Sequence, residues 1–135
     1  MTRVLFVCIG NACRSPMAEG FANYYGRGWL TAYSAGSCPA RAIMPNTIKV
    51  MQEKGIDISH QSSKGLFAVD LELMDWVIVL EATLSNSIAA KSLRAQRLNW
   101  CISDPVGQSI DVYRSIRDEI EVRVLDFIEV VRRDS

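Results

Sequence analysis

The chain has 135 residues, of which 49% are hydrophobic and 22% are charged, and its formal net charge is zero. This length suits one domain with one core, so we expect residues 1–135 to form a single domain. A net charge of zero offers no overall attraction to nucleic acid or to an acidic membrane, and we expect neither as a partner. Any anion that the protein binds must be attracted locally.

The apolar segments and the cysteines predict a cytoplasmic protein. No apolar run approaches the roughly 20 residues that span a bilayer. Gly10 and Asn11 interrupt the N-terminal apolar stretch too early for a signal peptide. The cysteines form no C-x-x-C pair and there is a single histidine, so we expect no zinc site and instead free thiols in a reducing compartment. The cysteines are Cys8, Cys13, Cys38 and Cys101, and the histidine is His60.

The N-terminal part of the chain predicts a strand, a helix and a second strand. Residues 3–8 form a short apolar run, as in a strand buried on both faces of a parallel sheet. Ser15 can cap the helix that follows, Pro16 suits its first turn, and Gly26 ends it. A second strand is expected at residues 30–34, followed by a loop. The apolar positions expected on one face of the helix are Met17, Phe21, Tyr24 and Tyr25.

The rest of the chain continues the alternation of helices and strands. The predicted segments are a helix begun by Pro45 and ended by Gly55, a strand at residues 75–80, a helix at 84–93, a strand at 97–101 and a long helix at 109–133. The apolar stripe of the long helix is Tyr113, Ile116, Ile120, Val124, Phe127 and Val131. This alternation predicts an α/β fold: a single domain whose four-stranded parallel sheet has helices on both faces.

Two loops of this fold are candidates for a site. Ligands of open parallel sheets bind at the carboxyl ends of the strands, where the Cys8 loop and the Asp104 loop are expected. If Cys8 ends the first strand and Ser15 begins the helix, the loop between them exposes successive backbone N–H groups. Those groups and the N-terminus of the helix can together hold an anion.

The side chains of the Cys8 loop suit a bound phosphate. Gly10 permits close approach of the backbone, Asn11 tolerates a left-handed conformation, and Arg14 can grip two phosphate oxygens. A helix N-terminus and a nearby arginine favour the ionised form of a thiol, so we expect Cys8 to be a thiolate that can attack phosphorus. Ser15 can donate its hydroxyl to that sulfur.

The loop carries the sequence C-I-G-N-A-C-R-S-P-M-A-E at residues 8–19. It resembles the phosphate loop of the low-molecular-weight protein tyrosine phosphatases, and equally that of the thioredoxin-coupled arsenate reductases, which share their fold. The resemblance covers essentially the whole chain, including residues 33–36, 55–60, 104–105 and 113–124. It implies a cysteine-dependent enzyme that needs no metal and no organic cofactor.

The resemblance also implies a role for each matching residue. Cys8 matches the nucleophile, Arg14 the arginine that grips phosphate, and Asp104 the general acid. Acid catalysis suits this chemistry, because cleaving a phosphate ester requires a proton on the leaving oxygen. The other implied positions are the polar network of Asn11, Ser15 and Ser34, the supporting residue His60, and the loop residues Ile9, Gly10, Ala12 and Cys13.

The two branches of this superfamily differ in their further residues. Thioredoxin-coupled reductases place additional thiols just after the strand that reads V-I-V-L here, where this chain has E-A-T-L-S-N and no cysteine. The phosphatases usually place an aromatic residue after Asp-Pro, where this chain has Val106. Residues 104–120 resemble the reductase branch more closely.

We favour a phosphatase that hydrolyses phosphate monoesters through a phosphocysteine, because Cys8, Arg14 and Asp104 suffice for that reaction. The alternative is an arsenate reductase of the same fold that uses thioredoxin, or glutathione and glutaredoxin. The expected ligand is accordingly phosphate, arsenate or a phosphorylated substrate. A third hypothesis is an oxyanion-binding domain without catalysis.

The remaining thiols bear on this choice. Cys38 lies on a loop expected to face the site, whereas Cys101 is expected to be a buried thiol at the end of a strand. Either could resolve an arsenate adduct on Cys8. Cys13 either forms a reversible disulfide with Cys8 under peroxide or packs beneath the loop as a small apolar residue.

Overall fold

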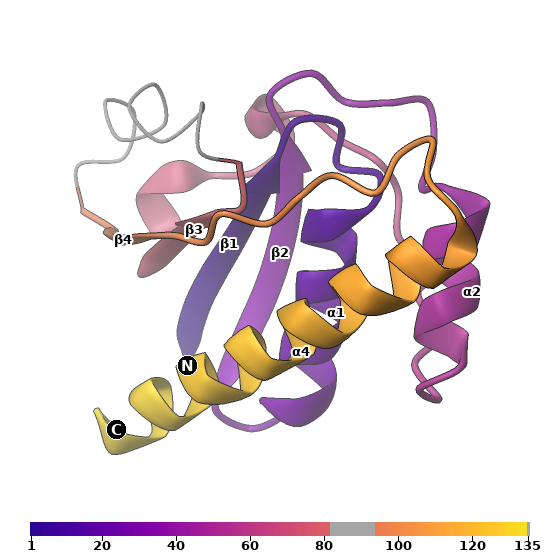
Figure 1. Cartoon of the computed structure of the whole chain (residues 1–135). Coiled ribbons are helices and arrows are strands. Elements are labelled where there is room, and N and C mark those ends of the chain that lie inside the picture. Colours follow the sequence, from indigo (N-terminus) through magenta and orange to yellow (C-terminus); the bar gives the residue numbers. More distant parts are fainter. Residues whose placement is uncertain (82–93, 135) are drawn as a thin grey trace.

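The computed structural model describes residues 1–81 and 94–134. Its strands are all parallel and form one sheet in the order β2-β1-β3-β4 (Figure 1). Their bounds are β1 (Thr2–Cys8), β2 (Leu30–Gly36), β3 (Trp76–Val79) and β4 (Gln96–Asn99). The predicted single α/β domain with a four-stranded parallel sheet is confirmed.

The described helices cover one face of the sheet, as Figure 1 shows for α1 and α4. They are α1 (Arg14–Tyr25), α2 (Pro45–Gln52) and α4 (Ile110–Arg133). Side chains alternate along β1, so Val4 and Phe6 pack with these helices while Leu5 and Val7 face the other way. Two 3₁₀ turns, η1 (Leu66–Ala68) and η2 (Leu71–Leu73), cover the second face. The helix predicted at residues 84–93 lies outside the described residues.

The long helix α4 confirms its predicted stripe. All six apolar positions of that stripe are buried against the sheet and α1. Asp111 lies in the first turn and Arg132 and Arg133 in the last, where each charge complements the helix dipole. In the part of the chain that the structure describes, no helix has the combination of length and apolar character that crossing a membrane requires.

Several local predictions differ from the structure. Strand β2 continues to Gly36, because its pairing with β1 extends to the pair formed by Cys8 and Gly36. Strand β4 spans Gln96–Asn99, so it begins one residue earlier and ends two residues earlier than the predicted strand at 97–101. Tyr24 and Tyr25 are exposed, because α1 extends past the edge of the core at its last turn.

The order of the strands places the site. The chain leaves β1 toward β2 on one side, and β3 lies on the other side of β1. Crossovers therefore run in opposite directions from β1, and the carboxyl end of this strand is the position where doubly wound sheets bind ligands. Cys8 is the last residue of β1.

Candidate functional site

The loop between β1 and α1 is held by its carbonyl groups. The backbone N–H groups of the segment that follows β2 donate to the carbonyls of Cys8, Ile9, Gly10 and Ala12, at N–O distances between 2.8 and 3.2 Å. The donors are Ser37, Cys38, Ala40 and Met44. The loop thus has one polar edge, the carbonyl edge, already paired with protein.

The amide edge of the same loop is different. Among the described residues, no backbone N–H of residues 9–15 donates a hydrogen bond to a protein acceptor. Backbone donors of buried residues are almost always paired, and donors at a helix N-terminus are ready for an anion. The loop therefore has the polarity of an oxyanion site.

Asn11 gives the loop its shape. Its φ is +48°, so the predicted left-handed conformation is confirmed. The side chain supports this conformation from both ends: Nδ2 donates to Ser15 Oγ at 2.9 Å, and Oδ1 accepts from the Lys64 amide at 2.9 Å. Ser63 adds a hydrogen bond from its hydroxyl to the Gly10 carbonyl at 2.9 Å. Residues 63–64 thus support the loop, a role that the sequence analysis did not predict.

Two backbones approach each other closely at Gly36, the last residue of β2. A Cβ on Gly36 would lie 2.5 Å from the Ile9 carbonyl oxygen and 2.8 Å from the Asn11 nitrogen. A Cβ on Gly10 would make only ordinary contacts with Ala12 and Ala40. Because only glycine fits at the end of β2, Gly36 lets this strand pack against the loop.

The thiol of Cys8 is buried and contacts the first turn of α1. Its Sγ lies 2.9 Å from Ser15 Oγ, and either atom can be the donor. The prediction that Ser15 caps the helix is wrong: α1 begins at Arg14, Cys13 is the residue before it, and no side chain caps it. The Ser15 hydroxyl instead bonds side chains of the loop, because it already lies inside the first turn.

The guanidinium of Arg14 is held on one side. Its side chain is only 2% exposed, and Nη1 donates to the carbonyls of Leu80 at 3.2 Å and Ile102 at 2.8 Å and to Glu81 Oε1 at 2.9 Å. Nη2 lies 3.6 Å from Asp104 Oδ2. Two segments that are far from Arg14 in the sequence, 80–81 and 102–104, thus orient its side chain.

Asp104 reaches the same pocket from the loop after β4. Its Oδ1 accepts from the Val106 amide at 3.1 Å, and its side chain is 45% exposed. The pocket has a volume of about 180 Å³, and its described lining includes no aromatic ring. The lining residues are Cys8, Ile9, Gly10, Ala12, Cys13, Arg14, Ala40, Met44, Asp104 and Val106. The structure therefore brings together the predicted nucleophile, arginine and acid.

The other three thiols lie in different surroundings, and all four cysteines are free. Cys13 is buried, its Sγ donates to Tyr113 Oη at 3.9 Å, and burial raises the pKa of its thiol. Burial also raises the pKa of Tyr113 to about 12. Cys38 is exposed on the segment that contacts the loop. Cys101 is exposed too, so the prediction of a buried thiol is wrong; it follows β4, an edge strand whose four residues are all exposed.

Two predicted supporting residues lie elsewhere. The Ser34 hydroxyl donates to Glu19 Oε1 at 2.5 Å, and burial raises the pKa of that carboxyl. Ser34 therefore contacts α1 and not the loop side chains. His60 is exposed and lines a separate cavity of about 350 Å³ together with residues of α1 such as Glu19. Among the described contacts, Ser63 and Lys64 support the loop where His60 was expected to do so.

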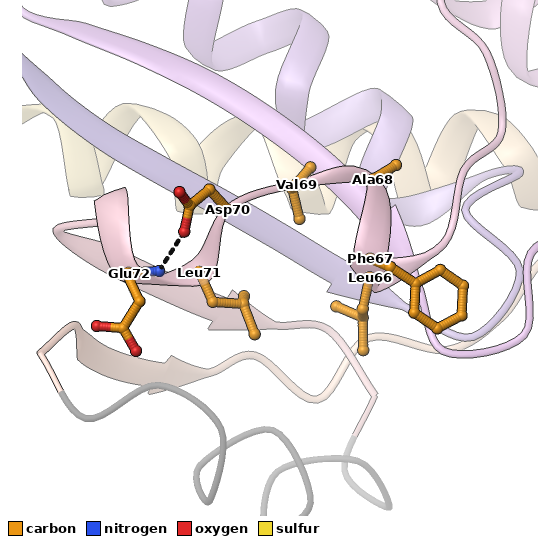
Figure 2. A pocket seen from close by; sticks show the side chains of 7 residues that line it. All are labelled: Leu66, Phe67, Ala68, Val69, Asp70, Leu71 and Glu72. Atoms are coloured by element: carbon orange, nitrogen blue, oxygen red, sulfur yellow. Dashed lines mark hydrogen bonds between the residues drawn. The ribbon is translucent and has the colours of Figure 1, made fainter.

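A larger hollow lies on the second face of the sheet, at η1 and η2 (Figure 2). Its volume is about 610 Å³ and residues 66–72 line it. The carboxylate of Asp70 accepts a hydrogen bond from the Glu72 amide at 3.0 Å, the dashed line in Figure 2. This lining contains no cation and no nucleophile among the described residues. The chemistry of an oxyanion therefore belongs to the smaller pocket at Cys8.

Comparisons with known proteins agree with this geometry. A glutaredoxin arsenate reductase of Synechocystis sp. (strain ATCC 27184 / PCC 6803 / Kazusa) is 38% identical over 128 residues, which are 95% of this chain and 97% of that protein. The structure of an arsenate reductase in the phosphate binding state shares 34% identity and a TM-score of 0.86, and the match covers 97% of this chain and 99% of that chain.

The structure of the YwlE arginine phosphatase from Geobacillus stearothermophilus shares 26% identity and a TM-score of 0.88, over 99% of this chain and 95% of that chain. The relatives therefore include both branches that the sequence left open. The family model for the low molecular weight phosphotyrosine protein phosphatases matches residues 3–135. The chain accordingly belongs to the low molecular weight phosphotyrosine protein phosphatase family.

Proposed function

We propose that the protein reduces arsenate to arsenite at Cys8. The observation that carries this proposal is the polarity of the loop: its carbonyls are paired with protein, whereas the amides of residues 9–15 are left for an oxyanion. The pocket of about 180 Å³ suits a bare tetrahedral anion, because pockets for larger ligands usually exceed about 300 Å³. The names of the relatives also favour the reductase over the phosphatase that we favoured from the sequence.

The reaction has two chemical stages. The Cys8 thiolate attacks arsenic, an arsenate oxygen protonated by Asp104 leaves as water, and a sulfur–arsenic bond forms. A second thiol then attacks the Cys8 sulfur. The sulfur–arsenic bond breaks, its electron pair reduces arsenic to the trivalent state, and arsenite leaves as a disulfide forms on Cys8. A further thiol reduces that disulfide and restores Cys8.

The thiols come from outside the chain in this proposal. Residues 81–93 contain no cysteine, so the position after β3 offers no resolving thiol. A relative named glutaredoxin arsenate reductase supports a donor of the glutathione and glutaredoxin class, and thioredoxin is the alternative. Such donors, and four free cysteines, fit the cytoplasm. Cys38 is exposed, and its amide bonds to the Ile9 carbonyl of the loop, so it is a thiol of the chain that could assist.

A second candidate is hydrolysis of phosphate monoesters. It is favoured by Asp104, which lines the pocket beside Arg14 and is exposed enough to exchange protons. In this reaction the Cys8 thiolate attacks phosphorus while Asp104 protonates the leaving oxygen. Asp104 then activates water to hydrolyse the phosphocysteine.

A side-by-side assay tests both candidates. Arsenate-dependent oxidation of NADPH is measured with glutathione, glutaredoxin and glutathione reductase, and separately with thioredoxin and its reductase. Hydrolysis of an aryl phosphate is measured on the same preparation. We expect arsenate-dependent oxidation that Cys8→Ser abolishes. Aryl phosphate turnover without any arsenate reduction would establish the second candidate instead, and phosphate binding without either activity would leave only an oxyanion-binding domain.

A further inference from the structure

We propose that Glu81 is a positioning residue of the oxyanion site, which fixes the orientation of Arg14 and sets its affinity for anions. The inference rests on the proposed function in one respect, namely that Arg14 binds the oxyanion. In the sequence, Glu81 begins a segment without cysteines, and no role was predicted for it.

The backbone that carries Glu81 is held firmly in place. Glu81 is the second residue after β3, and the amide of the intervening Leu80 donates to the Val7 carbonyl at 2.8 Å. Leu80 is fully buried. The backbone before Glu81 is therefore anchored to the central strand, and its side chain starts from a fixed point at the carboxyl edge of the sheet.

The two terminal nitrogens of the Arg14 guanidinium have different surroundings. Within the described part of the chain, every hydrogen bond of Arg14 comes from Nη1, which serves Glu81 and the carbonyls of Leu80 and Ile102. Nη2 lies 3.6 Å from Asp104, beyond a good hydrogen bond. The remaining donors of the fork are thus available to two oxygens of a tetrahedral anion. Glu81 helps to decide which edge of the guanidinium faces the pocket.

Glu81 also balances the positive charge of Arg14. A buried guanidinium needs a partner of opposite sign, and two carboxylates are near Arg14. Glu81 is the closer and the less exposed, at 2.9 Å and 21%, against 3.6 Å and 45% for Asp104. Asp104 gives up its charge whenever it carries a proton, as the proposed reaction requires. Glu81 therefore keeps the guanidinium partly neutralised throughout, which weakens its hold on anions and favours product release.

Two variants separate orientation from charge. Glu81→Gln keeps a hydrogen-bond acceptor for Nη1 but removes the charge, so the dissociation constant for inorganic phosphate should fall roughly threefold to tenfold. Glu81→Ala removes both, so the misplaced guanidinium should lower kcat roughly 10²-fold. The binding constant is measured by calorimetry on the full chain, and kcat and KM in whichever assay shows turnover.

A matched control is Glu53→Gln, which removes the charge of another glutamate paired with arginines, between α2 and α4. It should lower the thermal midpoint and leave phosphate binding unchanged. Unaltered phosphate binding in Glu81→Gln, or wild-type kcat in Glu81→Ala, would overturn the inference. Because phosphate binding needs no turnover, Glu81 remains testable even where the proposed reduction fails.

Discussion

Two arginine–carboxylate clusters of this protein contain similar residues but differ in how many guanidinium nitrogens are bonded to protein. Between α2 and α4, Arg114 donates from Nε and Nη2 to Glu53 and from Nη1 to Asp111, and Arg117 donates to Glu53 at 2.6 Å. All three nitrogens of the Arg114 guanidinium are thus bonded to protein. At Arg14 only Nη1 is bonded in the described contacts.

The difference shows what separates a structural cluster from a site. The cluster at Glu53 is partly exposed, and every guanidinium nitrogen of Arg114 already donates to a carboxylate, so this cluster holds α4 to the end of α2. The cluster at Arg14 is buried and incomplete, and its remaining donors border a pocket that also contains Cys8 and Asp104. Buried donors without partners are costly, which is why this cluster favours an added anion.

The largest effect should come from the thiol. Cys8→Ser should lower either activity on the order of 10⁴-fold or more, because a serine hydroxyl at this position is not ionised and is a poor nucleophile. Its fold should be unchanged, since serine is close in size to cysteine. Cys38→Ser is the matched control and should lose far less activity. Turnover that survives in Cys8→Ser would remove Cys8 from the mechanism.

A smaller loss is expected at the acid. Asp104→Asn should slow turnover about 10²- to 10⁴-fold, the range of a missing general acid. The loss should be greater for aryl phosphates with poor leaving groups, because these depend most on protonation. A series of substituted aryl phosphates measures this dependence. An equal loss across the series would indicate that Asp104 acts on Arg14 and not on the leaving group.

Exchanging arginine for lysine compares the two clusters directly. Arg14→Lys should weaken phosphate binding roughly 10- to 150-fold, since a charged hydrogen bond contributes about 1.5–3 kcal/mol and lysine offers no planar fork. Arg114→Lys should lower stability only slightly, because its ion pairs are exposed to solvent, and should leave phosphate binding as it is. Calorimetric titration with phosphate and urea unfolding measure the two effects. Similar behaviour of both variants would refute the distinction drawn between the clusters.

The smallest effect is a dependence of stability on pH. Hydrogen bonds from Arg114 lower the pKa of Glu53 from its ordinary 4.5 to about 2. Because the pKa is lower in the folded state, the stabilisation is complete above the unfolded value and is lost as the pH falls toward the folded one. The free energy of unfolding should therefore decline more steeply below about pH 5 in the wild type than in Glu53→Gln. Parallel declines would argue against this ion pair as the source.

The parts of the site that sequence reasoning predicted are local. The end of β1 at Cys8 and the left-handed Asn11 lie within a few residues of each other. Short-range periodicity and backbone preferences determine such features. Asp104 is the exception, because the resemblance to a family indicated it where its own Asp-Pro pair did not.

The predicted roles of Ser34 and His60 depend on long-range packing. Ser34 was assigned to the loop, but its register on β2 turns it toward Glu19 of α1. Nothing near His60 in the sequence showed that the loop would be supported by Ser63 and Lys64 instead. A stronger signal existed for Glu81: a charged residue directly after a buried strand lies at the carboxyl edge, where parallel sheets bind ligands.

Hydrophobic period and residue types at fixed spacing were enough to predict the α/β class, the described helices and strands and the loop at Cys8. The tertiary structure alone decided which groups hold Arg14, because Leu80, Glu81 and Ile102 lie more than sixty residues away along the chain. Only the folded sheet brings the ends of distant strands together. Its geometry pairs the loop carbonyls with protein and leaves the amides for an oxyanion.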